Sequence, residues 1–233
     1  SPIDGRNMNR AFPGHRDEDS VTGIIAHYMA HEIIPKADLV VDIHSGAVTG
    51  HWIPCVNMHH VPDDEQMSRM IEAGKVWGTP YVFIYRDIAG SGLLPGYSES
   101  LGKVTLGTEI GGAAQYGREM VAITENGVDN VLRHVGILDG EITRPAAAPQ
   151  VVAADRHEDY VMAPVGGVFE PFVDLGSHVE VVQELGQIHS LERPFDDAYP
   201  VQAETDGRVI SRRQCPRTQR GDYLVAIVRP CDL

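Results

Sequence analysis

Apolar residues recur at helical spacing in three segments of the first 140 residues. Between Ser20 and Pro35, apolar side chains return every three or four residues, with Ser20 as a candidate N-cap and Pro35 as a stop. The same spacing predicts helices at 63–77 and 119–135. The buried face of the first helix is expected to consist of Ile24, Ile25, Tyr28, Met29 and Ile33.

Short runs rich in β-branched residues predict strands at 37–43, 81–85 and 103–108. A Gly/Ser/Pro-rich stretch at 89–100 is predicted as a loop that precedes the last of these strands. Strands that alternate with helices predict an α/β domain, with a mostly parallel sheet and flanking helices.

The pattern changes at a stretch rich in Pro and Ala, which occupies 143–154. Helical periodicity disappears beyond it, and short alternating segments separated by Gly and Asp turns predict a small C-terminal all-β barrel or sandwich. The sequence therefore predicts an α/β domain at 1–145 and a β domain at 155–233.

Composition narrows the classes of partner. The chain has 19 Lys and Arg against 33 Asp and Glu, and a net charge of −14 repels nucleic acids and anionic membranes, so neither is expected as a partner. The longest stretch without charged residues, Ile43–Pro62, contains four histidines and is too polar for a membrane span. Three widely spaced cysteines fit neither a disulfide framework nor a cysteine zinc site, so we expect a cytoplasmic protein.

His44 follows the predicted strand at 37–43, in the run Asp42-Ile43-His44-Ser45-Gly46. Ligand crevices form beyond the carboxyl ends of strands in α/β sheets, and imidazole is a common zinc ligand. A histidine that caps the strand or is hydrogen-bonded in the core is an equally simple interpretation.

Glu109 follows another predicted strand and precedes Gly111 and Gly112. A carboxylate at a buried edge can act as a general base if desolvation raises its pKa, and the glycines would let a ligand approach closely. A helix N-cap or an ordinary surface acid is the alternative for this glutamate.

Asn9 and Arg10 lie in a loop without an apolar period, SPIDGRNMNRAFPG. The planar guanidinium of arginine suits a carboxylate, and a neighbouring asparagine can orient the same group. Loop arginines are usually solvated, which is the alternative here.

Several other polar side chains are expected to be structural. His27 and His31 are predicted on a polar helix flank, and His59–His60 in a solvated turn. Cys55 is expected to pack in a mainly apolar strand. Tyr97 and Tyr116, in glycine-rich segments on either side of Glu109, are candidates for substrate contact.

Taken together in this order, the motifs DGRNMNRAFPG, DLVVDIHSGA and GTEIGGAAQYG resemble the succinylglutamate desuccinylase/aspartoacylase family of carboxypeptidase-like zinc amidohydrolases, and most of all its N-acetyl-diaminobutyrate deacetylase branch. The resemblance implies zinc-dependent hydrolysis of the N-acyl amide of a small N-acyl amino acid. It implies His44 as a ligand of one zinc ion, Glu109 as general base and proton shuttle, and Asn9 with Arg10 as the grip on the substrate carboxylate. A homo-oligomer is left open.

The chain departs from this family in one respect. A His-x-x-Glu pair that supplies two zinc ligands precedes the Asn-Arg motif in the family, whereas only eight residues precede Asn9 here. We therefore expect the given sequence to lack its N-terminal portion, with two further ligands upstream of Ser1. His15-Arg16-Asp17-Glu18 has the spacing but follows Asn9, and it is expected to be loop and helix-start charge. Arg6 is a candidate to replace the family's carbonyl-polarising arginine.

Two other functions stay open, a metal-free scaffold or binding protein and a peptide carboxypeptidase.

The C-terminal segment resembles a biotinyl/lipoyl carrier fold, but the last lysine of the chain is Lys103, so it has no attachment site for either cofactor. The resemblance implies that this domain covers the mouth of the active site or an oligomer interface.

Overall fold

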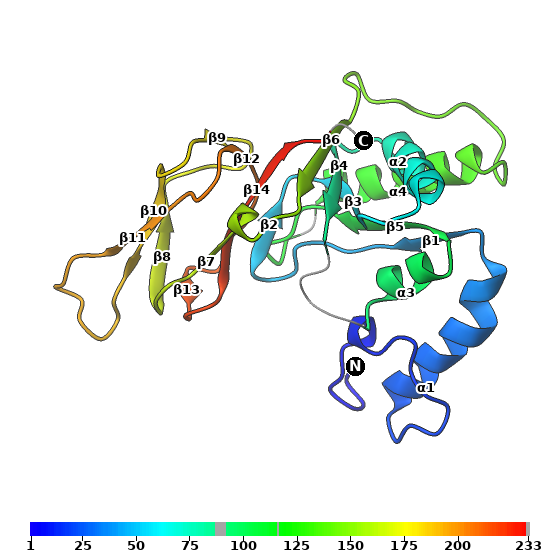
Figure 1. The fold of residues 1–233 in the computed structure, drawn as a ribbon, viewed down its shortest axis with the longest axis horizontal. Coiled ribbons are helices and arrows are strands. Elements are labelled where there is room, and N and C mark those ends of the chain that lie inside the picture. Colours follow the sequence, from blue (N-terminus) through cyan, green and yellow to red (C-terminus); the bar gives the residue numbers. More distant parts are fainter. Residues whose placement is uncertain (87–91, 116, 232–233) are drawn as a thin grey trace.

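The computed structural model describes residues 1–86, 92–115 and 117–231, and places the longer helices at one end of the molecule (Figure 1). The helices are α1 (Val21–Tyr28), α2 (Asp64–Trp77), α3 (Leu94–Ser100) and α4 (Arg118–His134). The strands that precede residue 110 are β1 (Leu39–Asp42), β2 (Gly50–Trp52), β3 (Cys55–His59), β4 (Tyr81–Tyr85) and β5 (Val104–Glu109). Short 3-10 helices occupy Met8–Arg10, Ile34–Lys36 and His157–Asp159, and a π-helix occupies Met29–Ile33.

The strands beyond residue 145 belong to two sheets. They are β6 (Gln150–Ala154), β7 (Tyr160–Met162), β8 (Gly167–Pro171), β9 (His178–Val179), β10 (Glu184–His189), β11 (Tyr199–Gln202), β12 (Gly207–Arg213), β13 (Arg217–Thr218) and β14 (Tyr223–Pro230). Among the described residues the larger sheet runs in the order β1-β5-β3-β4-β6-β14-β12-β2, with β7 beside β14 and β9 beside β12. The smaller sheet has the order β11-β10-β8-β13.

The α/β prediction is confirmed for the first part of the larger sheet. Parallel pairs join β1 to β5, β3 to β4 and β4 to β6, and only the β3–β5 pair among these neighbours is antiparallel. In Figure 1, α2 and α4 lie on one side of these strands, and α1 and α3 lie on the other. The predicted strands and the helices at 63–77 and 119–135 agree with β1, β4, β5, α2 and α4 to within about two residues, the usual uncertainty of helix and strand ends.

The predicted buried face of the first helix is wrong except for Met29, which is partly buried against an apolar cluster. Ile24 and Tyr28 are 48% and 59% exposed, whereas Ala26 and Ala30 are fully buried. These small side chains pack with Phe12 in a separate apolar cluster, and a Cβ at Gly14 would overlap the α1 backbone. The helix therefore approaches the N-terminal loop through its small residues, and its larger apolar residues stay at the surface.

One other local prediction also fails. The segment predicted as a loop at 89–100 forms α3 from Leu94, with Pro95 in its first turn, where proline is tolerated; residues 89–91 lie outside the described part. The predicted boundary stretch contains β6, which pairs with both β4 and β14 and so links the two parts of the chain through one sheet.

The C-terminal part is a β structure, as predicted. Its apolar cluster includes Phe169, Leu185 and Ile188 from the smaller sheet, and Val209 and Leu224 from the larger one. The division into 1–145 and 155–233 stays a prediction. No helix in the described part of the chain has the length and apolar character that a membrane crossing requires.

We expect Gly127→Ala to destabilise the fold. Gly127 is buried in α4, where an added Cβ would overlap the indole ring of Trp77 on α2. Overpacking of this kind costs typically ~1–3 kcal/mol, which exceeds the gain of about 1 kcal/mol in helix propensity. Chemical denaturation of Gly127→Ala should show a lower free energy of unfolding than wild type. The matched control is Gly117→Ala, where a Cβ meets nothing within 4 Å; a Gly127→Ala variant as stable as this control would contradict the expectation.

Candidate active site

The carboxyl ends of β1 and β5 meet at one edge of the sheet. The strands are parallel and their last register pair joins Asp42 to Gly107, so His44 and Glu109 emerge at the same edge. A cavity of about 370 Å³ opens there, and all four residues predicted for the site, Asn9, Arg10, His44 and Glu109, line it. Crevices at this edge are the usual ligand sites of α/β sheets.

Asp42 connects two of these side chains. Its Oδ2 accepts a hydrogen bond from Asn9 Nδ2 at 2.7 Å, and its Oδ1 lies 2.9 Å from His44 Nε2. Asn9 Nδ2 is also 3.0 Å from the same imidazole nitrogen. The hydrogen bond with Asp42 raises the pKa of His44 against the opposing effect of partial burial.

The loop that bears Asn9 is anchored on two sides. Asn7 caps the 3-10 turn by accepting from the Asn9 amide, and Asn9 Oδ1 accepts from the Leu94 amide at 2.7 Å. Arg10 follows with an exposed side chain whose Nη1 donates to the Asn9 carbonyl at 2.5 Å. Asn9 is therefore fixed between β1 and the start of α3, while the Arg10 guanidinium stays at the cavity and accessible to an anion.

Glu109 has a strongly perturbed environment. Burial raises its pKa to about 7, an effect that His44 opposes and Asp42 reinforces. Its Oε2 is buried and has no hydrogen-bond partner among the described residues. This carboxyl group can therefore both accept and donate a proton near neutral pH, as a general acid–base group requires.

Cys55 lies directly opposite Glu109 in the β3–β5 pair. Burial, reinforced by the Glu109 charge, raises the pKa of its thiol well above the ordinary value. A nucleophilic thiolate is therefore disfavoured, in agreement with the predicted packing role.

Gly112, one of the two glycines after Glu109, has a role in packing. Gly112 has a φ of +133°, and a Cβ there would overlap the Gly50 carbonyl and crowd Gly46. Gly112 lets the end of β5 pack against the segment that follows His44, because a side chain there would block the contact. Close approach of a ligand at these glycines stays a prediction.

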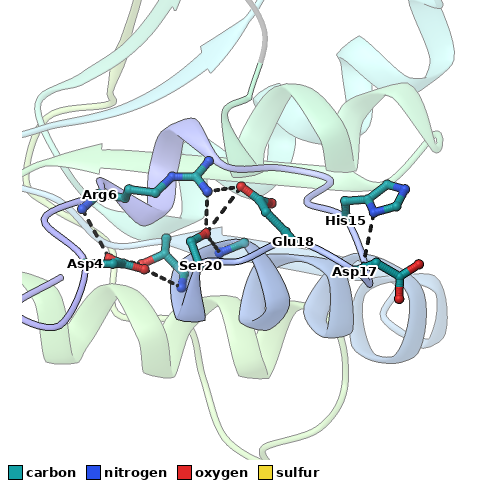
Figure 2. Close-up of polar contacts among 8 residues, drawn as sticks. Asp4, Arg6, His15, Asp17, Glu18 and Ser20 are labelled. Carbon is teal, nitrogen blue, oxygen red and sulfur yellow. Dashed lines mark hydrogen bonds and ion pairs between the residues drawn. The ribbon is translucent and has the colours of Figure 1, made fainter.

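Arg6 and the His15–Glu18 segment lie elsewhere. Figure 2 shows the Arg6 guanidinium on Glu18 and Ser20 at the start of α1, and His15 Nδ1 accepting from the Asp17 amide at 3.2 Å. Within the described residues the cavity lining does not include Arg6. The segment is helix-start charge, as predicted, and the structure gives no support to Arg6 as the carbonyl-polarising group.

The rings of His27 and His31 contact each other in a tilted arrangement, with centroids 4.1 Å apart, and His31 Nδ1 donates to the His27 carbonyl. The predicted solvated turn at His59 is wrong, because this side chain is buried on β3 with Nδ1 2.5 Å from Glu99 Oε2. Glu99 could not be predicted as the partner of His59, because the two residues are far apart in the sequence.

The structure describes one of the two tyrosines that were candidates for substrate contact. Tyr97 donates its hydroxyl to the Ala30 carbonyl at 3.2 Å and stacks with Phe12, so it holds α3 against the N-terminal helices. Tyr116 lies outside the described residues.

The cavity also contains residues that sequence reasoning did not select. They are Asn7, Asp42, Asn57, Tyr85, Arg86, Leu93, Pro95, Gly107 and Tyr160. Asp42 could have been predicted from the sequence, since it precedes His44 by two residues and side chains at this spacing lie on the same face of a strand. Tyr160 had none, because β7 reaches the cavity only through the fold of the C-terminal part.

A catalytic zinc ion takes three protein ligands and a water. His44 is one suitable ligand, but no group of three His, Cys, Asp or Glu residues that could hold a metal ion occurs in 1–86, 92–115 and 117–231. The described residues do not by themselves complete a zinc site.

Comparison with known proteins gives a consistent set of relatives. The model of the succinylglutamate desuccinylase/aspartoacylase catalytic domain matches residues 1–135. The N-alpha-acetyl-L-2,4-diaminobutyric acid deacetylase of Halomonas elongata is 34% identical over 227 residues, which cover 97% of this chain and 66% of that protein. The chain thus spans slightly less than two thirds of this curated relative.

Solved structures agree over nearly the whole chain. A succinylglutamate desuccinylase/aspartoacylase of Rhodobacter sphaeroides superposes with a TM-score of 0.92 and 30% identity, covering 100% of this chain and 70% of that one. The product-bound ectoine utilization protein EutE (DoeB) of Ruegeria pomeroyi gives a TM-score of 0.91 and 32% identity, with coverages of 98% and 69%.

We expect the Glu109 carboxyl to titrate with a midpoint of about 7 instead of its ordinary 4.5. His44→Ala should raise this midpoint, because the charge of His44 favours ionisation of Glu109. Carbon-13 NMR of the side-chain carboxyl measures both values. A wild-type midpoint near 4.5 would contradict the burial that raises it.

Proposed function

We propose that this chain, which belongs to the succinylglutamate desuccinylase/aspartoacylase family, hydrolyses the N-acyl amide bond of a small N-acyl amino acid. The observation that carries the proposal is the single cavity lined by Asn9, Arg10, His44 and Glu109. The names of the Halomonas and Ruegeria relatives favour N-acetyl-diaminobutyrate as the first substrate to test.

Arg10 and Asn9 are proposed to hold the substrate carboxylate. The exposed guanidinium of Arg10 can form paired hydrogen bonds with both carboxylate oxygens. Asn9 is restrained by Asp42 and Leu94, so the loop presents Arg10 with little conformational freedom. Positioning of this kind lowers the entropy that the substrate loses when it reaches a reactive orientation.

Glu109 is proposed as the general base and then the general acid. It accepts a proton from the water whose oxygen bonds to the acyl carbon, and returns it to the amine nitrogen as the carbon–nitrogen bond breaks. The products are a carboxylic acid and a free amine. Because the base must be ionised, kcat/KM should fall as pH drops through about 7.

We also propose that the protein is zinc-dependent, with one ion per chain and His44 as the ligand that this sequence supplies. The family supports this proposal. The raised pKa of His44 means that ion binding competes with protonation of its imidazole.

The C-terminal part is proposed to have a carrier-like fold that carries neither biotin nor lipoate. Tyr160 on β7 lines the candidate cavity, which supports a role for this part at the mouth of the site. Its hydroxyl donates to the Ala154 carbonyl at 3.1 Å, which holds the ring in place. A cytoplasmic location is proposed for the protein.

A metal-free scaffold or binding protein is the second candidate, favoured by the incomplete ligand set among the described residues. Calorimetry that shows binding of N-acyl amino acids, together with no hydrolysis of a panel that includes peptides, would favour it. Preferential release of C-terminal residues from peptides would favour a carboxypeptidase.

Glu109→Gln should reduce kcat for acetate release from N-acetyl-diaminobutyrate by ~10²–10⁴-fold, because glutamine cannot carry the proton. The variant keeps the shape of the side chain, so its melting temperature should not fall. Glu119→Gln, in the first turn of α4, is the control that removes a carboxylate outside the cavity. Unchanged turnover of Glu109→Gln would remove Glu109 from the mechanism.

His44→Ala should lower zinc content measured by elemental analysis after dialysis, since one ligand and its share of the affinity are lost. His134→Ala, at the end of α4, is the matched control and should retain zinc at the wild-type level. Equal zinc in wild type and His44→Ala would exclude His44 as a ligand, and no zinc in wild type would refute the metal proposal.

A further inference from the structure

The regular pairing of β1 with β5 ends before it reaches His44. The last register pair joins Asp42 to Gly107, and Thr108 and Glu109 continue β5 against Val56 and Cys55 of β3. His44 therefore lies beside β5 but beyond the parallel ladder. Something other than the ladder must determine where its backbone lies.

Beyond the ladder, the side chain of Thr108 forms hydrogen bonds with the His44 backbone. Its Oγ1 accepts a hydrogen bond from the His44 amide at 2.9 Å and donates one to the His44 carbonyl at 3.0 Å. A hydroxyl group can do both, because it has one donor hydrogen and two acceptor lone pairs. Thr108 is fully buried, so water does not compete for these bonds.

We propose that Thr108 is a positioning residue for the hydrolysis proposed above, and that it fixes the imidazole of His44 beside Glu109 by clamping the His44 backbone. The effect of Thr108 on catalysis, as inferred here, rests on the proposed function. Thr108 directly precedes Glu109 in β5, so one short segment sets the place of both groups.

The other contacts of His44 act on different parts of the residue. Asp42 and Asn9 contact the imidazole, and they restrain the ring only if the backbone below it is already in place. The Ile110 amide donates to the His44 carbonyl at 3.2 Å, but of these contacts only that of Thr108 engages the His44 amide. A β-branched side chain also has few rotamers, which keeps the hydroxyl aimed at this backbone.

Three variants separate positioning from general packing. Thr108→Val keeps the shape and removes the hydroxyl, and Thr108→Ser keeps the hydroxyl. Thr105→Val is the matched control, because Thr105 is also fully buried on β5 and its hydroxyl lies 3.4 Å from the Lys103 carbonyl, not at His44.

The experiment measures amide hydrogen exchange at His44 by NMR, the melting temperature, and kcat and KM for N-acetyl-diaminobutyrate. Thr108→Val should raise the exchange rate at His44 by about tenfold, the effect of one lost hydrogen bond. It should lower kcat by up to about 10²-fold with little change in KM, because the reactive groups are misplaced after the substrate binds. Thr108→Ser and Thr105→Val should resemble wild type at His44.

Unchanged exchange at His44 in Thr108→Val would overturn the clamp, whatever the activity. Faster exchange with unchanged kcat would overturn its part in catalysis. If the wild-type protein hydrolyses no N-acyl amino acid, the proposed function fails, and the exchange rates still decide whether Thr108 holds His44.

Discussion

Parallel pairing of β1 with β5 determines where the groups of the candidate site lie. Their register brings the segment after Asp42 and the last residue of β5 to one edge of the sheet, so an imidazole and a carboxyl group from residues 65 positions apart share a cavity. The N-terminal loop reaches the same edge because Asn9 bonds to Asp42 and to the start of α3. A shift of this register by one residue would turn the side chains to the opposite face of the sheet, and the groups of the site would no longer lie together.

Both titratable groups at this edge have raised pKa values, but for different physical reasons. A hydrogen bond to Asp42 favours the protonated form of His44, while burial favours the neutral form of Glu109. Cys55, which lies opposite Glu109 on β3, belongs to an apolar cluster that also includes Ile210 and Ala226. The C-terminal strands therefore pack against a residue that adjoins this carboxyl group.

Much of this arrangement could be predicted from the sequence, because its signals are local. Apolar runs that end in a polar residue and glycine marked β1 and β5, and the parallel topology then brought His44 and Glu109 together, as expected. Asn9 and Arg10 were chosen for their chemistry, and the cavity includes both.

The failures share a physical cause, since each depends on contacts between distant segments. Helix α1 buries alanines because the loop around Gly14 packs against it, which no periodicity within the helix reveals. His59 is buried because Glu99 comes to it from α3, and Tyr160 enters the cavity from the C-terminal part. Propensity and spacing carry no information on such pairs, which tertiary packing decides.

A crystal structure of the protein with a bound amino-acid product tests the central claim most directly. The account predicts the product in the cavity between β1 and β5, with its carboxylate on Arg10 and its free amine within hydrogen-bond reach of Glu109. A product bound outside this cavity, or held there with the amine directed away from Glu109, would contradict it.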